Sequence, residues 1–119
     1  MDVIEFREYC LLKKGVTEEF PFDAVTLVFK VMDKMFAVTR LNHIESFKIT
    51  LKCDPEIAIE IREKHDCIEG AFHFNKKYWN SLTIDGSLSD DEIKQQIDHS
   101  YDEVVKKLTK KDKNYLWSL

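Results

Sequence analysis

Two lysines stand directly before a tyrosine and a tryptophan in the stretch FHFNKKYWNSLTIDG. Lys76 and Lys77 can neutralise phosphates, and Trp79 can pack on a sugar or on an unstacked base. Asn75 and Asn80 frame this group, and their amides can instead satisfy backbone groups where the chain enters a strand. The stretch therefore suits nucleic-acid binding, protein binding or local packing.

Further cations are expected on one face of a sheet. Alternation in SFKITLK places Phe47, Ile49 and Leu51 toward a core and the lysines on the opposite face. That face is predicted to display Lys30, Lys48, Lys52 and Trp79. Lysines beside an exposed aromatic ring suit phosphates and unstacked bases, whereas lysines alone also protect a solvated sheet from aggregation.

The last predicted helix begins with acidic residues and ends with lysines. These residues are Asp90, Asp91 and Glu92 at its start and Lys106, Lys107, Lys110, Lys111 and Lys113 at its end. This arrangement complements the helix macrodipole, so the lysines need no ligand to explain them. The alternative interpretation is that they line a phosphate backbone.

Other site chemistries find little support in the sequence. His65, Cys67 and His73 are metal-binding residue types, but their spacing matches no familiar zinc pattern. His43 falls in a predicted loop, and the scattered glycines form no phosphate-binding loop. The sequence therefore predicts a protein that is not an enzyme and that uses no metal or cofactor.

Composition is that of one ordinary globular domain. The 119 residues are 44% hydrophobic and 34% charged, with a formal net charge of −4. The acidic balance argues against a surface that binds phosphates throughout, but it allows a local basic patch. No apolar run approaches the roughly 20 residues of a membrane span. Three cysteines without a CxxC pair favour free thiols, and we expect a cytoplasmic protein.

Periodicity and capping signals predict the order α-β-β-β-α-β-β-α. The segment VTEEFPF is expected to be a loop, and TLVFKV begins a hairpin that pairs Val31 with Phe36 and Phe29 with Val38. Asp54-Pro55 and the SDDE box are typical helix starts. Short connections favour a single antiparallel sheet with helices packed on one face, which is an α+β fold.

Several motifs together resemble the MmcQ/YjbR family. The most distinctive are LKCDPE, NKKYWN and DHSYDEVVKKL, and the resemblance runs in order from about residue 2 to 111. It implies one domain over residues 1–111, with residues 112–119 as a C-terminal tail. It also implies a DNA-binding function and a fold related to CyaY-like and secretion-chaperone-like domains, sometimes called a double wing.

The residues and the resemblance lead to one expectation about function. We expect a small DNA-binding protein in which Lys76, Lys77 and the sheet-face lysines contact phosphates while Trp79 packs on sugar or base. Such binding is weak, sensitive to salt and largely independent of sequence. The alternative is a protein-interaction module that binds a peptide strand or an amphipathic helix.

Overall fold

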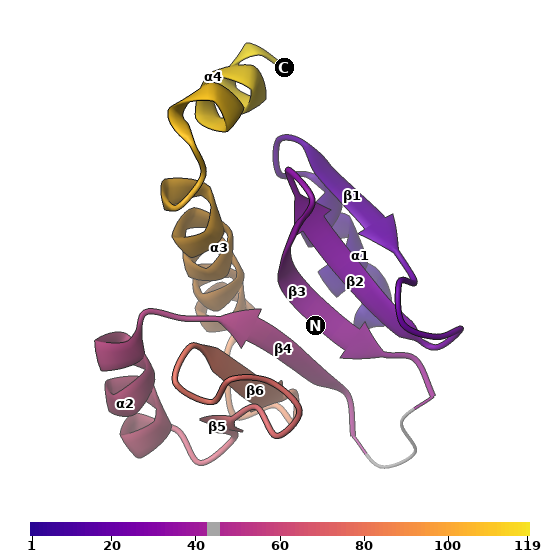
Figure 1. The fold of residues 1–119 in the computed structure, drawn as a ribbon. Coiled ribbons are helices and arrows are strands. Elements are labelled where there is room, and N and C mark those ends of the chain that lie inside the picture. Colours follow the sequence, from indigo (N-terminus) through magenta and orange to yellow (C-terminus); the bar gives the residue numbers. More distant parts are fainter. Residues whose placement is uncertain (43–45) are drawn as a thin grey trace.

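The computed structural model describes residues 1–42 and 46–119, and the predicted loop residue His43 lies outside them. It confirms the α+β class, with one six-stranded antiparallel sheet in the order β1-β2-β3-β4-β6-β5 (Figure 1). The elements are α1 (Val3–Leu11), β1 (Val16–Glu19), β2 (Thr26–Val31), β3 (Lys34–Arg40), β4 (Lys48–Lys52), α2 (Pro55–Lys64), β5 (Ile68–Gly70), β6 (Trp79–Thr83), α3 (Asp90–Lys106) and α4 (Lys110–Ser118).

Capping side chains start α1, α2 and α3, and the predicted starts at Asp54-Pro55 and at the SDDE box are confirmed. The Asp2 side chain accepts from the backbone N–H of Glu5, and the Glu5 side chain reaches back to complete a capping box. The Asp54 side chain accepts from two N–H groups of the first turn of α2, where Pro55 needs no acceptor. Ser89 and Glu92 form the corresponding box on α3. Each cap satisfies backbone N–H groups that have no partner inside the helix.

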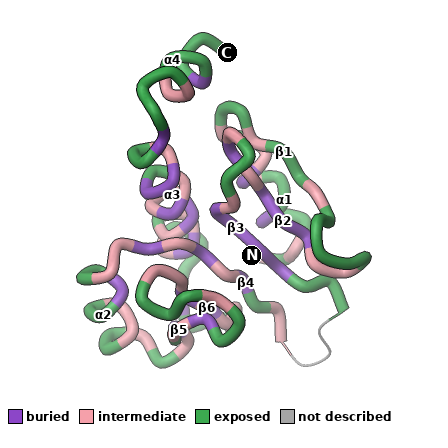
Figure 2. The backbone as a smooth tube through the Cα atoms, viewed as in Figure 1, coloured by how far each residue is buried: buried purple, intermediate pink, exposed green. Residues whose placement is uncertain are grey.

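Helices α1 and α3 cover one face of the sheet, and the core lies between them and the strands (Figure 2). Phe6 of α1 meets Phe29 of β2 edge to face, with ring centroids 5.4 Å apart. In β4 the predicted alternation is confirmed, because Ile49 and Leu51 are buried in this core while the intervening side chains face the other way. Among the residues that the structure describes, no helix covers the opposite face of the sheet.

The predicted register of the β2–β3 hairpin is wrong. Val31 pairs with Lys34, and Phe29 pairs with Ala37. Met32 and Asp33 both take positive φ values, 50° and 63°, so they form a two-residue turn whose twist matches the strands. Phe36 is then an extra residue opposite the break between Phe29 and Lys30, and this bulge keeps its ring in the core.

Two elements were not predicted from the sequence. Residues 16–19, expected to be a loop, form β1, which pairs with β2 and is tied to α1 by the Arg7–Glu18 ion pair at 2.6 Å. Residues 112–118, within the segment expected to be a tail, lie in α4, whose Leu116 is buried. A side chain at Gly15 would meet Leu116 at 2.5 Å. The backbone at this position also has a φ of +73°, so both the close contact and the backbone conformation favour glycine.

Ser100 of α3 connects β3 to β4 where their pairing stops. The two strands pair only from Ala37 to Thr39. Beyond this point the Ser100 hydroxyl donates to the carbonyl of Phe36 and accepts from the backbone N–H of Lys52 at 2.8 Å. One buried hydroxyl therefore takes the place of ladder hydrogen bonds and fixes α3 against the sheet.

Replacing Ser100 by alanine should lower the free energy of unfolding by about 2–4 kcal/mol, because two buried backbone groups lose their partner. Urea denaturation of the variant and the parent measures this difference. Ser118→Ala is the matched control, since that exposed hydroxyl bonds within its own helix. A loss as small as that of the control would contradict the bridging role.

Candidate functional site

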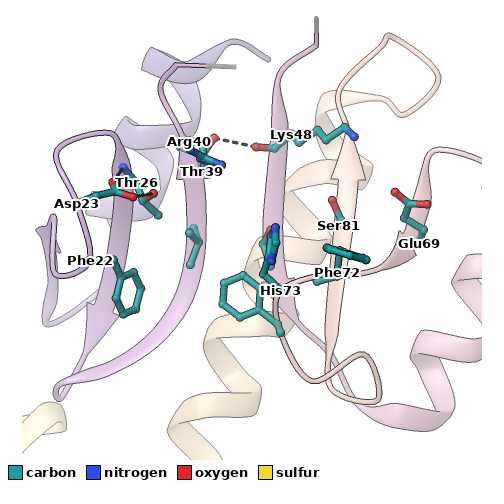
Figure 3. Close-up of a pocket in the computed structure, with 14 residues that line it drawn as sticks. Phe22, Asp23, Thr26, Thr39, Arg40, Lys48, Glu69, Phe72, His73 and Ser81 are labelled. Atoms are coloured by element: carbon teal, nitrogen blue, oxygen red, sulfur yellow. Dashed lines mark hydrogen bonds between the residues drawn. The ribbon is translucent and has the colours of Figure 1, made fainter. Parts of the chain in front are cut away.

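A groove of about 650 Å³ lies on the sheet face that the helices leave uncovered (Figure 3). Its floor is a row of neighbours on β3, β4 and β6, formed by Val38, Thr50 and Ser81. The loop before β2 borders one side and the loop after β5 borders the other. The floor is thus a rigid sheet and the walls are loops, which is a common arrangement for binding sites.

Three phenylalanine rings line the groove. Figure 3 shows Phe22 beside β2 and Phe72 on the opposite side, beside β6. Their exposed fractions are 63% and 79%, although large apolar side chains are usually buried. Phe74 also lines the groove and packs on Trp79, with ring centroids 5.2 Å apart. Exposed rings gathered around one hollow are typical of a surface that binds a partner.

The loop that carries Phe22 is held by the next residue. The carboxylate of Asp23 accepts hydrogen bonds from the backbone N–H groups of Val25 at 2.9 Å and of Thr26 at 2.6 Å, and from the Thr26 hydroxyl at 3.0 Å. These hydrogen bonds lower the pKa of the Asp23 carboxyl group, so it stays ionised. The Phe22 ring is therefore presented by an ordered turn.

Charges of both signs line the groove. Arg40 and Lys48 lie together near one end, where the Thr39 hydroxyl donates to the Lys48 carbonyl at 2.7 Å (Figure 3). Asp23 and Glu69 supply carboxylates to the same lining. The groove can thus contact an anionic group near Arg40 and Lys48 while its centre offers aromatic and hydroxyl contacts.

The predicted site residues are distributed over several places. Lys48 lines the groove, and Lys30 on the same face forms an ion pair with Glu19 at 3.3 Å. Lys76 and Lys77 line a second hollow, which also contains the acidic residues Asp54 and Glu56. Lys52 and Trp79 line a third hollow. The structure therefore does not gather the six residues into one patch.

Arg62 explains why the NKKYWN motif holds its shape. Its Nε donates to the side-chain oxygen of the buried Asn80 at 2.7 Å, and its guanidinium also donates to the carbonyls of Lys76 and Trp79. The Asn75 side chain accepts from the backbone N–H of Lys77 at 3.0 Å. Both asparagines are structural, and the Lys76 ammonium lies 5.6 Å from the Phe72 ring centroid, at the edge of the groove.

The DHSY motif is also structural. Asp98 accepts from the Tyr9 hydroxyl at 2.6 Å and pairs with Lys13, while the Tyr101 hydroxyl donates to the Lys14 carbonyl. Burial and the bond to Asp98 raise the pKa of Tyr9 to about 12. His99 Nε2 accepts from the backbone N–H of Asp54 at 3.1 Å. The motif thus fastens α3 to α1 and to the start of α2.

Within residues 1–42 and 46–119, no three His, Cys, Asp or Glu side chains form a group that could hold a metal ion. Burial raises the pKa of the Cys10 thiol, and it raises the pKa of the Cys53 thiol to about 11. In the described part of the chain, no helix is both long enough and apolar enough to cross a membrane.

The family model described as YjbR matches residues 11–103, which include the groove and both motifs. The chain belongs to the YjbR family. It is 31% identical to the "Uncharacterized protein YjbR" of Escherichia coli K12 over the whole length of both chains. It is 30% identical to the "Uncharacterized protein YbdF" of Escherichia coli O157:H7, over 78% of this chain and 75% of that protein.

Solved structures share the fold of this YjbR-family chain. The crystal structure of Deinococcus radiodurans protein DR2400, family-model domain DUF419, aligns with a TM-score of 0.88 and 36% identity over 96% of this chain and 86% of that one. A crystal structure from Pseudomonas syringae aligns with a TM-score of 0.72 and 26% identity over 84% of this chain and 96% of that one. The resemblance in sequence is confirmed at the level of family and fold.

Sequence reasoning missed the residues that build the groove in this YjbR-family protein. Phe22, Phe72 and Arg40 were not predicted as site residues, because the charge pattern of the sequence points to the lysines. A signal was present in the aromatic residues of FPF, in a predicted loop, and of AFHF, in the segment before the last predicted strand. Large apolar side chains in loops have no strand or helix face to bury them, so they are candidates for a binding surface.

The three thiols should differ in reactivity with a disulfide reagent at pH 8. Cys67 is half-buried, whereas Cys10 and Cys53 are buried and held protonated by their raised pKa values. Absorbance of the released thiol should show one fast reaction per native chain, and two more after unfolding in urea. Cys67→Ser should remove the fast reaction. A fast native reaction that survives in this variant would contradict the burial of the other two thiols.

Proposed function

We propose that this YjbR-family protein binds single-stranded DNA in the groove on the uncovered sheet face and acts without catalysis. The observation that carries the proposal is the exposure of Phe22 and Phe72 on opposite sides of one groove, with Arg40 and Lys48 near its end. Exposed aromatic side chains on which bases stack, combined with nearby cations, are the usual means of holding unpaired strands.

Stacking supplies the first part of the binding energy. A base that stacks on an aromatic side chain contributes about 1–3 kcal/mol, and this contribution hardly depends on sequence. Phe22 and Phe72 are largely exposed to solvent, so a base can stack on their rings without displacing core side chains. Duplex DNA keeps its bases stacked inside the helix, so only unpaired strands can offer bases to these rings.

Phosphate contacts supply the second part. Arg40 and Lys48 line the groove, and Lys76 lies beside Phe72 at its edge. Lys30 contributes less, because Glu19 already compensates its charge. Asp23 and Glu69 oppose phosphates, as does the net charge of −4. Binding is therefore weak and falls steeply with salt.

The competing proposal is a peptide-binding module. It is favoured by the carboxylates of Asp23 and Glu69, which line the groove together with Arg40 and Lys48 and suit a chain that carries both charges. Apolar side chains of a peptide would fill the space between the phenylalanine rings. Binding of this kind changes little with salt, which separates it from phosphate binding.

Phe72→Ala should weaken binding of a fluorescein-labelled oligothymidylate by about 5- to 100-fold, because one stacking contact is lost. Fluorescence anisotropy at several salt concentrations measures the affinity. Leu12→Ala is the matched control, since Leu12 is 81% exposed and does not line the groove. Equal losses in both variants would show that Phe72 is not a stacking platform.

Lys48→Glu should weaken the same binding and flatten its salt dependence by about 0.7 in the slope of log affinity against log salt, because one phosphate contact is removed. Lys111→Glu is the matched control, since this exposed lysine lies in α4 and does not line the groove. A salt slope that stays the same in Lys48→Glu, in a protein with native circular dichroism, would remove Lys48 from the interface. Affinity that ignores salt altogether would favour the peptide-binding module.

A further inference from the structure

The third hollow, which Lys52 and Trp79 line, lies where β3 and β4 no longer pair. It has a volume of about 350 Å³, near the lower end of the roughly 300–1,000 Å³ typical of small-molecule sites. Lys34 comes from the start of β3, Lys52 from the end of β4, and Lys107 from the C-terminal cap of α3. Three lysines that are far apart in the sequence therefore line one cavity.

The positive charge of this hollow is poorly compensated. Its lining includes no carboxylate among the residues that the structure describes. Burial lowers the pKa of Lys52, and repulsion from Lys107 and Lys34 lowers it further. Glu103 acts on Lys52 in the opposite sense, but its carboxylate is paired with Lys106. A bound anion would relieve the repulsion among the three lysines.

An aromatic and apolar wall lies beside the lysines. Trp79 lines the hollow and packs on Phe74, which belongs to the lining of the groove. Met35, Val104 and Leu108 complete the wall. The Lys107 ammonium lies 5.2 Å from the centroid of the Tyr78 ring, which lines the second hollow.

We propose that this hollow binds a phosphate monoester, with the phosphate held by Lys34, Lys52 and Lys107 and the organic part resting on Trp79. Lysines act as separate point charges and suit a tetrahedral anion approached from several sides, whereas a planar carboxylate is better matched by arginine. The phosphate can belong to a free nucleotide or to the end of a nucleic-acid strand. The site does not depend on the groove, because it shares no lining residue with it.

The test uses the fluorescence of Trp79 in the full chain, with Trp117, which is 62% exposed, replaced by phenylalanine. Inorganic phosphate, adenosine monophosphate, and oligothymidylates with a 5′-phosphate or a 5′-hydroxyl are titrated at constant ionic strength. We expect a saturable change with the phosphate monoesters. Tighter binding of the free nucleotide identifies a small molecule, and a preference for the 5′-phosphorylated strand identifies a strand end.

Lys52→Met and Lys107→Met should each weaken this binding by about tenfold or more, because a charge-assisted contact is lost. Lys111→Met is the matched control and should bind as the parent does. No saturable change with any phosphate monoester in the folded protein would overturn the proposal. Unchanged affinity in both Lys52→Met and Lys107→Met would overturn it as well.

A groove variant separates this proposal from the proposed function. Phe72→Ala should leave the affinity for adenosine monophosphate unchanged, because Phe72 does not line the hollow. Loss of oligothymidylate binding with retained nucleotide binding would therefore concern the groove alone. A loss of nucleotide binding in this variant, with the fold intact, would contradict the independence of the two sites.

Discussion

β3 and β4 pair over three residues, and the Ser100 hydroxyl of α3 supplies hydrogen bonds where their ladder stops. Because this hydroxyl is fully buried, both backbone groups that it contacts depend on it. The position of α3 is then fixed relative to both halves of the sheet. Core packing on the helix-covered face follows from this position. The third hollow follows from it as well, since Val104 of α3 and Leu108 just after α3 line that hollow.

The distinctive motifs and the candidate interface have different roles. Arg62 holds NKKYWN through the side chain of Asn80, the last residue of the motif. DHSY fastens α3 to α1 and to the start of α2. The exposed rings that border the groove lie instead in loops outside both motifs. A motif that marks the family can therefore preserve the scaffold, while the surface that contacts a partner is built from neighbouring loops on that scaffold.

Local signals in the sequence were sufficient for much of the fold. Asp54-Pro55 and the Ser89–Glu92 box predicted helix starts, and alternation in β4 predicted its buried face, because these patterns act within a few residues. The predicted β2–β3 register was wrong, because the actual register depends on the positive φ values of Met32 and Asp33 and on a bulge at Phe36. Aromatic residues in loops gave a signal for the groove, whereas the third hollow was beyond prediction, since it joins residues as distant as Lys34 and Lys107 through tertiary packing.

The most direct test of the account asks which face of the sheet meets single-stranded DNA. Oligothymidylate is titrated into ¹⁵N-labelled protein, and the backbone amide shifts are followed by NMR. The account predicts progressive shifts at the groove amides, including those of Arg40, Lys48, Thr50 and Ser81, while the solvent-facing sides of α1 and α4 stay unchanged. Shifts confined to α1 or α4, with the groove amides unmoved, would contradict it.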